Sequence, residues 1–288
     1  MSSRWLERVR YAADRFRLPF RSRIWRGQVG NWAGAGSGGS IDFQDHRPYV
    51  PGDDPRHVDW QAYARSGHYV MKLYREEVSP AVDLVLDGSR SMSYQEEKKT
   101  RALELFAFVL ESARRSQCAA RAWVLDDDGP SPVSPALFFE GRLDPLSLDD
   151  LAGTGGRVVL DQVPFRPGSL RVLLTDALFP DPPETLVRRL ASGRGQGVVL
   201  APGARSESSP DWVGPLDFED CESGARRLER IDESRLAEYG ARYRSHFALW
   251  KAGCRRYGIA FAQIPAEGDL TRALRDRALP EGAVELCR

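Results

Sequence analysis

The sequence contains few residues of the kinds that hold transition metals or form disulfides. Among its 288 residues there are only four cysteines and four histidines. They are Cys118, Cys221, Cys254, Cys287, His46, His57, His68 and His246. No two cysteines form a CxxC pair, and no two histidines have HExxH or HxH spacing. This pattern argues against a zinc site, a dense disulfide framework and a histidine-based metal centre.

The sequence also lacks net charge and long apolar runs. It has 41 basic and 41 acidic side chains, which argues against nucleic-acid binding by bulk electrostatics. No run approaches the roughly 18 apolar residues of a membrane span, and the opening MSSRWLERVR has no apolar signal region. With 42% hydrophobic residues the composition is that of a globular protein. We therefore expect a cytoplasmic protein with no transmembrane segment and no nucleic-acid partner.

The neutral total conceals a basic N-terminal segment. Residues 1–26 contain eight arginines against Glu7 and Asp14, so the rest of the chain carries a charge of −6. Apolar residues recur every three or four positions, which predicts an amphipathic helix within residues 1–27. Such a helix either packs on its own protein, which we favour, or binds a membrane surface or an acidic partner. The glycine-rich residues 28–40 predict a joint or an irregular loop.

The next segment is dense in charge and aromatic rings. Within residues 41–77, arginines alternate with aspartates and glutamates, and tyrosines and a tryptophan lie between them. Arginine pairs bidentately with carboxylates, so ordered pairs could hold an irregular segment in one shape. We favour such a scaffold over a docking surface. A nucleic-acid surface is the weaker alternative, because the acids cancel the basic charge.

From residue 81 the pattern changes to alternating strands and helices. Buried strands are expected at 81–87, 119–125, 170–176, 197–202 and 258–264, with 136–140 as a hairpin partner of the second. Helices are expected at 96–117, 183–192, 232–257 and 269–279. This order predicts an α/β domain over residues 81–288, with an open, mostly parallel Rossmann-like sheet covered by helices on both faces. The N-terminal helix and the irregular or β segment of residues 28–80 precede it.

Two of the expected strands end in aspartate, at Asp87 and Asp176. In the common 3-2-1-4-5-6 order they are neighbours at the switch point, where ligands of such folds bind. Asp87 begins the sequence DGSRS, so Ser89 and Ser91 follow at alternate positions. Hydroxyls, carboxylates and waters suit Mg²⁺, and Thr154 could add a third hydroxyl. The alternative is a loop whose Asp and Ser cap the following helix.

The arrangement Asp-x-Ser-x-Ser, then a threonine, then a later aspartate resembles the metal-ion-dependent adhesion site of von Willebrand factor A domains. The resemblance implies that Asp87, Ser89, Ser91, Thr154 and Asp176 bind Mg²⁺, or else Mn²⁺ or Ca²⁺. It also implies an open coordination position that is filled by a carboxylate of a partner protein.

The upstream segment resembles the bacterial "domain of unknown function 58" family, over about residues 28–270. The residues that carry this resemblance are Arg47, Tyr49, Pro51, Gly52, Asp53, Arg56, Asp59, Trp60, Arg65 and Glu77. The resemblance implies a von Willebrand factor A-like protein that works with a MoxR-type AAA+ ATPase in the chaperone-like assembly or maturation of protein complexes. The family residues would serve as scaffold or docking surface, and the client protein is unknown.

Enzymatic interpretations have less support. A phosphatase of the haloacid dehalogenase type also carries an aspartate after its first strand, but Ser89 stands where its second aspartate is expected. GSRSM is not a GxSxG nucleophile elbow, and no histidine follows at a suitable position. We therefore expect a non-enzymatic interaction module with a metal site. The alternative is a Mg²⁺-dependent, phosphatase-like hydrolase that uses Asp87.

Overall fold

The structure is a computed structural model that describes residues 2–20, 41–76, 81–126, 128–136, 158–179 and 181–287. The chain divides into two compact units, which are described separately. Unit 1 contains residues 1–22 and 80–288, and unit 2 contains residues 23–79. The basic N-terminal segment is therefore part of the same unit as the expected α/β domain.

Unit 1 is built on a six-stranded sheet with the order β11-β8-β7-β4-β5-β6. Its strands are β4 (Ala81–Asp87), β5 (Ala119–Asp126), β6 (Gly129–Val133), β7 (Leu170–Leu174), β8 (Gln196–Gly203) and β11 (Ala260–Pro265). All neighbours are parallel except β5 and β6. Along the chain this is the order 3-2-1-4-5-6, so β4 and β7 lie side by side as expected. The mixed α/β class with a mostly parallel sheet is confirmed.

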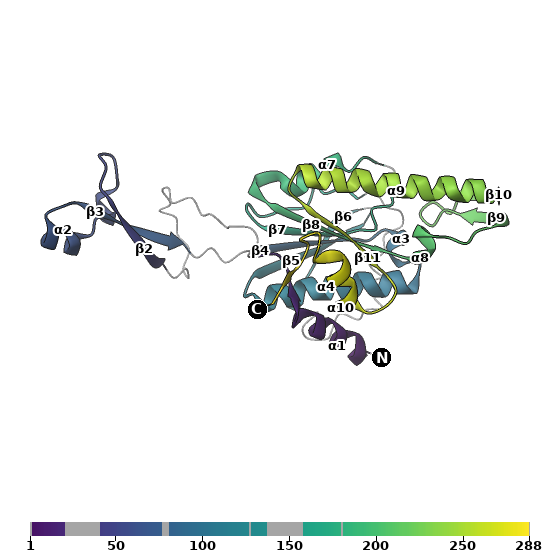
Figure 1. Cartoon of the computed structure of the whole chain (residues 1–288), viewed down its shortest axis with the longest axis horizontal. Helices are drawn as coiled ribbons and strands as arrows, with labels where there is room; N and C mark the ends of the chain where they lie inside the picture. The colour runs from purple at the N-terminus through teal and green to yellow at the C-terminus, as the bar shows by residue number, and fades with distance from the viewer. Residues whose placement is uncertain are drawn as a thin grey trace. The chain divides into compact units, whose positions relative to one another are not determined.

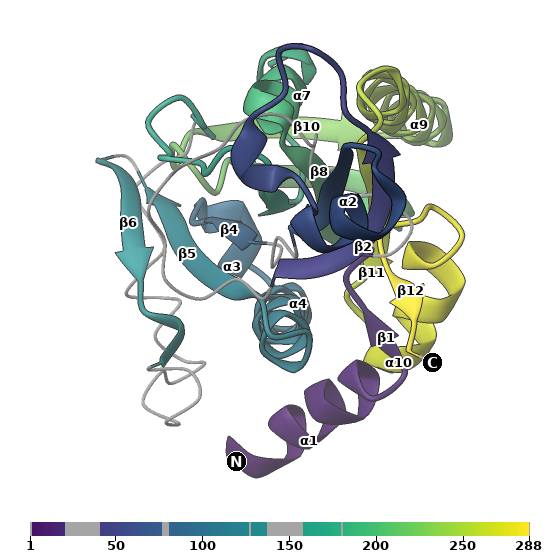
Figure 2. The same cartoon turned by 90° about the vertical axis from the view of Figure 1, so that its left-hand side faces the viewer.

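Helices cover both faces of this sheet (Figures 1 and 2). On one face lies α4 (Glu96–Arg115), which contacts β4, β5, β7 and β8. Its buried stripe includes Ala102, Leu105 and Val109, which recur at three- and four-residue spacing. On the other face lie α7 (Glu184–Ala191) and α9 (Glu233–Arg256). Their buried residues, among them Leu190 and Trp250, pack on the sheet in one apolar cluster.

The N-terminal helix α1 (Ser2–Ala13) packs against α4. Val9 and Ala12 are buried, and the Arg8 guanidinium pairs with the buried Glu104 carboxylate at 2.9 Å. The helix is shorter than the expected segment of residues 1–27. It ends at Ala13 and is followed by a short strand β1 (Phe16–Arg17), which pairs antiparallel with β12 (Glu285–Leu286). Residues 21–27 lie outside the described part of the chain.

The partner of β5 differs from the expectation. The expected partner was residues 136–140, of which 137–140 lie outside the described residues. The observed partner is β6, which pairs Ala122 with Val133 and Asp126 with Gly129. The sequence did not predict this strand, because Pro130 and Pro132 are unfavourable in most strands. They are tolerated here because β6 is an edge strand.

The C-terminal helix lies where it was expected, over residues 270–278 against the predicted 269–279. It consists of α10 (Leu270–Ala273) followed by a π-helical turn, η4 (Leu274–Ala278). Short elements that the periodicity did not indicate are α3 (Arg90–Ser93), η3 (Ser192–Arg194), α8 (Arg205–Ser208), β9 (Gly214–Glu219) and β10 (Arg226–Ile231). The last two form a separate antiparallel hairpin. No described helix is both long enough and apolar enough to cross a membrane.

Unit 2 is a small antiparallel hairpin with two short helices in its connection. The strands β2 (Ile41–Pro48) and β3 (Val70–Glu76) pair with a register shift between Phe43 and Asp45. The connection contains η1 (Pro55–His57) and α2 (Trp60–Ser66). Among residues 46–72 of this unit, Val58, Asp59 and Met71 are buried.

Candidate functional site

The candidate site begins with the loop that follows β4. Asp87 is the last residue of that strand and is buried, as is Ser89 two positions later. The Asp87 carboxylate accepts a hydrogen bond from the Ser89 N–H at 2.9 Å, which closes the loop on itself. The hydroxyl oxygens of Ser89 and Ser91 lie 3.0 Å apart. The DGSRS sequence therefore gathers one carboxylate and two hydroxyls within a few residues.

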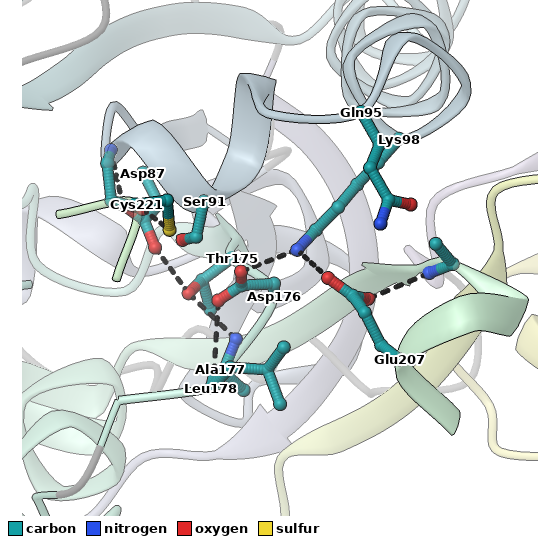
Figure 3. A network of polar contacts seen from close by, with 12 residues as sticks. Asp87, Ser91, Gln95, Lys98, Thr175, Asp176, Ala177, Leu178, Glu207 and Cys221 are labelled. Carbon is teal, nitrogen blue, oxygen red and sulfur yellow. Dashed lines mark hydrogen bonds and ion pairs between the residues drawn. The ribbon is translucent and has the colours of Figure 1, made fainter. Parts of the chain in front are cut away.

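The end of β7 supplies the second half of the site. In the β4–β7 ladder Leu86 pairs with Leu174, so Asp87 and Thr175 follow as neighbours at the same sheet edge. The Thr175 hydroxyl donates to the Asp87 carboxylate at 2.6 Å and accepts from the Ala177 N–H. Asp176 comes next, and its Oδ1 accepts from the Leu178 N–H at 3.0 Å. Figure 3 shows these side chains converging between the two strands.

A buried lysine binds the Asp176 carboxylate from the opposite side. The ammonium of Lys98, on α4, lies 2.7 Å from Asp176 Oδ2 and 2.5 Å from Glu207 Oε1 (Figure 3). The Lys98 side chain is completely buried. Burial alone would lower the pKa of Lys98, but the two carboxylates outweigh it and the pKa is raised. Lys98 is therefore charged and neutralises part of the acidic site.

The charged form of the Asp87 carboxyl is disfavoured in this site. Its pKa is raised to about 6, chiefly because burial disfavours the charged form and secondly because Asp176 is close. Hydrogen bonds from Thr175 and Ser89 act in the opposite direction. The carboxylates of Asp176 and Glu207 thus share the Lys98 ammonium, while the buried Asp87 carboxyl lies close to Asp176. A cation bound here would relieve the remaining excess of negative charge.

A fourth carboxylate reaches the site from the β9–β10 hairpin. Glu222 lies in the turn between these strands, 131 residues from Ser91 along the chain. Its carboxylate accepts hydrogen bonds from the Ser91 N–H at 2.7 Å and from the Arg90 N–H at 3.2 Å. The side chain therefore sits directly on the DGSRS loop.

The donor set of the loop fits a small, hard cation. Two neighbouring ligands of an Mg²⁺ octahedron, each about 2.1 Å from the ion, lie about 3.0 Å apart. The Ser89 and Ser91 hydroxyl oxygens have that separation. The described residues contain no group of three or more His, Cys, Asp or Glu side chains arranged to hold a metal, so the hydroxyls would be essential. The fifth expected ligand, Thr154, lies outside the described residues.

The expected family residues occupy unit 2, where two of the arginines bind carboxylates with both ends of the guanidinium. Arg47 donates to the two oxygens of Asp53 at 2.7 and 2.6 Å. Arg56 binds Asp54 in the same manner, and this pairing lowers the pKa of Asp54 to about 2. Both pairs bracket the turn that begins at Pro51 and Gly52, and Gly52 adopts a φ of +105° that favours glycine.

Asp59 connects the hairpin of unit 2 to its helix. One carboxylate oxygen accepts from the Gln61 and Ala62 N–H groups and so caps α2, while the other bonds His46 on β2 at 2.8 Å. The pKa of Asp59 is lowered to about 2, first by the His46 hydrogen bond.

The remaining family residues lie around this unit. Trp60, Tyr63 and Tyr69 form a cluster of rings, in which Tyr63 and Tyr69 stack at 4.5 Å and Trp60 meets them edge-on. Tyr49 contacts Tyr69, and Arg65 bonds the Gln61 carbonyl. Glu77 lies outside the described residues.

Sequence reasoning missed four residues of the candidate site: Lys98, Thr175, Glu207 and Glu222. Lys98 left a detectable trace, because it lies four residues before Ala102 and seven before Leu105, on the apolar stripe of α4. Thr175 directly precedes Asp176 at the end of a buried strand. Nothing local marks Glu207 or Glu222, because each reaches the site from a distant segment.

The comparison with protein families addresses the expected family. The sequence model of the family described as "Protein of unknown function DUF58" matches residues 45–136. Over these residues the chain matches the DUF58 family, which supports the expected family. The match includes the arginine–aspartate pairs of unit 2, β4, the DGSRS loop and α4, and is shorter than the expected 28–270. The family's description names no function.

No curated protein matches this chain. One solved structure that is similar is described as the crystal structure of an aerotolerance-related membrane protein from Bacteroides fragilis NCTC 9343 with multiple mutations to serines. It is 16% identical, covers 61% of this chain and 99% of its own, and has a TM-score of 0.33. At that score the likeness carries no argument about this chain.

Proposed function

We propose that this DUF58 protein is a non-enzymatic interaction module. Its α/β unit is a von Willebrand factor A-like domain, and the loop after β4 holds a divalent cation of the Mg²⁺ class. Ser89 and Ser91 bind the cation directly, while Asp87 and Asp176 supply negative charge. An acidic side chain of a partner protein completes the coordination, and the cation thereby becomes the point of recognition.

The observation that carries this proposal is the geometry of the DGSRS loop. Its two hydroxyl oxygens are 3.0 Å apart, the spacing of neighbouring ligands around Mg²⁺, and both lie beside the buried Asp87. A helix-capping role alone does not require this arrangement, because neither serine side chain caps a helix. Ser89 is the N-cap residue of α3, but its side chain makes no capping hydrogen bond. The Ser89 N–H itself donates to the Asp87 carboxylate.

The excess of acidic groups supports the same proposal. The Lys98 ammonium binds Asp176 and Glu207, and the buried Asp87 carboxyl close to Asp176 is bonded by the Thr175 hydroxyl and the Ser89 N–H. Buried carboxylates without a counter-charge are costly, and a bound cation removes that cost. Asp176 is already bonded at both oxygens, by Lys98 and by the Leu178 N–H. We therefore assign Asp176 an electrostatic role and the serines the direct contact.

The partner that we propose is a MoxR-type AAA+ ATPase, in chaperone-like assembly or maturation of a client protein complex in the cytoplasm. The support for it is the family resemblance, together with the DUF58 match over residues 45–136. A MoxR-type ATPase gene next to the gene for this chain would strengthen this assignment. Retention of that ATPase on the immobilised protein in Mg²⁺, and its loss in a chelator, would test it directly.

The alternative is a Mg²⁺-dependent hydrolase that uses Asp87 as nucleophile, and the geometry disfavours it. Both Asp87 oxygens accept hydrogen bonds, from the Ser89 N–H and from the Thr175 hydroxyl. Ser89 stands where a general acid or base is needed. His246, the histidine of residues 81–288, is bonded through Nε2 to the Ala177 carbonyl and is not directed at Asp87.

Calorimetric titration with Mg²⁺ tests the proposal. The wild-type protein should bind one cation in the millimolar range or tighter. Asp87→Asn should abolish binding, because it removes the buried negative charge, while the matched control Asp211→Asn changes an exposed aspartate outside the site and should bind as the wild type does. No binding of Mg²⁺ or Mn²⁺ by the wild type would refute the metal site. Turnover of phosphoesters that is lost in Asp87→Asn would support the hydrolase instead.

A further inference from the structure

The β9–β10 hairpin, whose turn carries Glu222, belongs to neither the six-stranded sheet nor the long helices that cover it. Its strands pair only with each other among the described strands. Gly214 pairs with Ile231 at the base of the hairpin, and Glu219 pairs with Arg226 next to the turn. Much of it is exposed, and Leu228 is 81% exposed. Figure 1 shows it at the end of the unit where α3 and α8 lie. Among the described strands, no backbone pairing therefore joins the hairpin to the six-stranded sheet.

The turn of this hairpin is shaped to present Glu222. The Asp220 carboxylate accepts hydrogen bonds from the Glu222 and Ser223 N–H groups at 2.8 and 2.9 Å, and Gly224 closes the turn with a φ of +70°. The Glu222 carboxylate then bonds the N–H groups of Ser91 and Arg90. In Figure 3 the adjacent Cys221 lies beside Asp87 and Ser91. A local turn thus fixes a carboxylate on the DGSRS loop.

We propose that Glu222 is an intramolecular competitor, which occupies the place that an acidic side chain of the partner takes when it binds. This inference rests on the proposed function, because it concerns the same site. The partner's carboxylate must approach the cation beside Ser91, and the Glu222 carboxylate already lies there. The ligand class that the site accepts is therefore an acidic peptide segment, and binding requires the hairpin turn to release.

The hairpin is held unequally at its two ends. Near its base the Trp212 ring contacts the rings of Phe218 and Tyr239, at 5.4 Å in both cases. The Tyr239 hydroxyl donates to the Glu207 carbonyl, and the Glu207 carboxylate binds Lys98. The turn itself is held to the DGSRS loop by two hydrogen bonds to Glu222. Release of the turn breaks these two bonds and leaves the aromatic base in contact with α9.

The test compares the binding of an acidic probe by the wild-type full chain and by variants of Glu222. The probe is a short fluorescent peptide of glutamates, followed by anisotropy in saturating Mg²⁺ and again in a chelator. Glu222→Gln keeps the shape and removes the charge, and Glu222→Ala removes the side chain. The matched control is Glu219→Gln, an exposed glutamate of β9 that binds Arg226 and does not contact the loop.

Both Glu222 variants should bind the peptide at least about tenfold more tightly than the wild type. A competitor that fills the position nine-tenths of the time weakens a ligand by that factor. Glu219→Gln should match the wild type, and the chelator should abolish binding in every protein. Calorimetry with Mg²⁺ alone separates the two claims. Equal peptide affinity in all four proteins, with Mg²⁺ bound, would overturn the competitor role and leave the metal site intact.

Two further outcomes would also overturn the inference. Mg²⁺ binding without peptide binding in any protein would show that no carboxylate position opens when Glu222 is removed. Absence of Mg²⁺ binding in every protein would refute the proposed function, and the competitor role with it. Circular dichroism of both variants verifies that they are folded, and agreement between Glu222→Gln and Glu222→Ala separates loss of charge from loss of packing.

Discussion

Replacement of Lys98 by methionine should destabilise unit 1 strongly. The Lys98 side chain is completely buried, and its ammonium contacts Asp176 at 2.7 Å and Glu207 at 2.5 Å. The variant leaves two carboxylates without their counter-charge, and the Asp176 side chain is only 3% exposed. Removal of one partner from a buried ion pair costs about 3–5 kcal/mol. We expect the free energy of unfolding to fall by about 4 kcal/mol.

Urea unfolding followed by circular dichroism at about pH 8 measures this loss, provided that the slope with urea stays that of the wild type. The matched control is Lys251→Met, which breaks the exposed pair with Glu281 at 3.1 Å and should cost less than about 1 kcal/mol. Addition of Asp176→Asn to Lys98→Met should restore part of the stability, because it removes one of the unpaired charges.

The pH dependence gives a second check on the same variant. Without Lys98, the two carboxylates stay in the site without a counter-charge, and their repulsion is largest where both are ionised. The destabilisation should therefore shrink as the pH falls from about 8 to about 5. A loss below about 1 kcal/mol at about pH 8, or a loss that does not change with pH, would refute the assignment of Lys98 as the counter-charge of the site.

Three other predictions follow from burial and charge. The pKa of Asp87 is raised to about 6, so the free energy of unfolding of the metal-free protein should fall as the pH rises from about 4 through 6. Asp87→Asn should remove this pH dependence and, in a chelator at about pH 8, raise the free energy of unfolding by about 3 kcal/mol. An unchanged pH dependence in urea titrations would contradict this. The pKa of Asp59 is lowered to about 2, so its contribution to unit 2 should persist above about pH 4 and disappear as the pH falls through 2. Amide signals of α2 in NMR spectra measure this, and their loss already near pH 4 would be inconsistent with it. Trp250→Ala should lower the free energy of unfolding by about 4 kcal/mol, because the ring is fully buried against Phe179 and Phe261; a loss below about 1 kcal/mol in urea would contradict its place in the core.

Much of the sheet could be predicted because its strands are marked by local patterns. β4 and β7 are near-continuous apolar runs, as strands buried on both faces are, and each is interrupted by one buried charged residue, Asp83 in β4 and Arg171 in β7. The long helix α4 shows a clear apolar stripe. The adjacency of β4 and β7 followed from the common strand order of such folds. β6 could not be predicted, because its two prolines are unfavourable in most strands and are accepted only at an edge.

The β9–β10 hairpin was missed because it lacks an apolar face of its own. In β9, GPLDFE, apolar and polar residues alternate only over residues 216–219, and β10, RRLERI, is rich in arginine and does not alternate. The C-terminal helix was predicted nearly to its ends, because the apolar period continues through Leu274. The sequence did not indicate that residues 274–278 form a π-helical turn.

The candidate site was predictable to the extent that it is local. Asp87, Ser89 and Ser91 lie in one loop, and Asp176 follows from the strand order. The charge balance was not predictable, because Lys98 and Glu207 arrive from different helices and meet only in the folded chain. Glu222 was equally invisible, because it lies 131 residues from Ser91. The folded chain therefore adds a buried ammonium and the Glu222 carboxylate to the candidate site, and the sequence of the loop indicates neither.

The most direct measurement of the central claim is an anomalous difference map from crystals of the wild-type protein soaked in Mn²⁺. The account predicts one peak within about 2.5 Å of the hydroxyl oxygens of both Ser89 and Ser91, and no such peak in crystals of Asp87→Asn. A map without a peak at this loop, or with the ion bound elsewhere and the Ser89–Ser91 pair left bare, would contradict it.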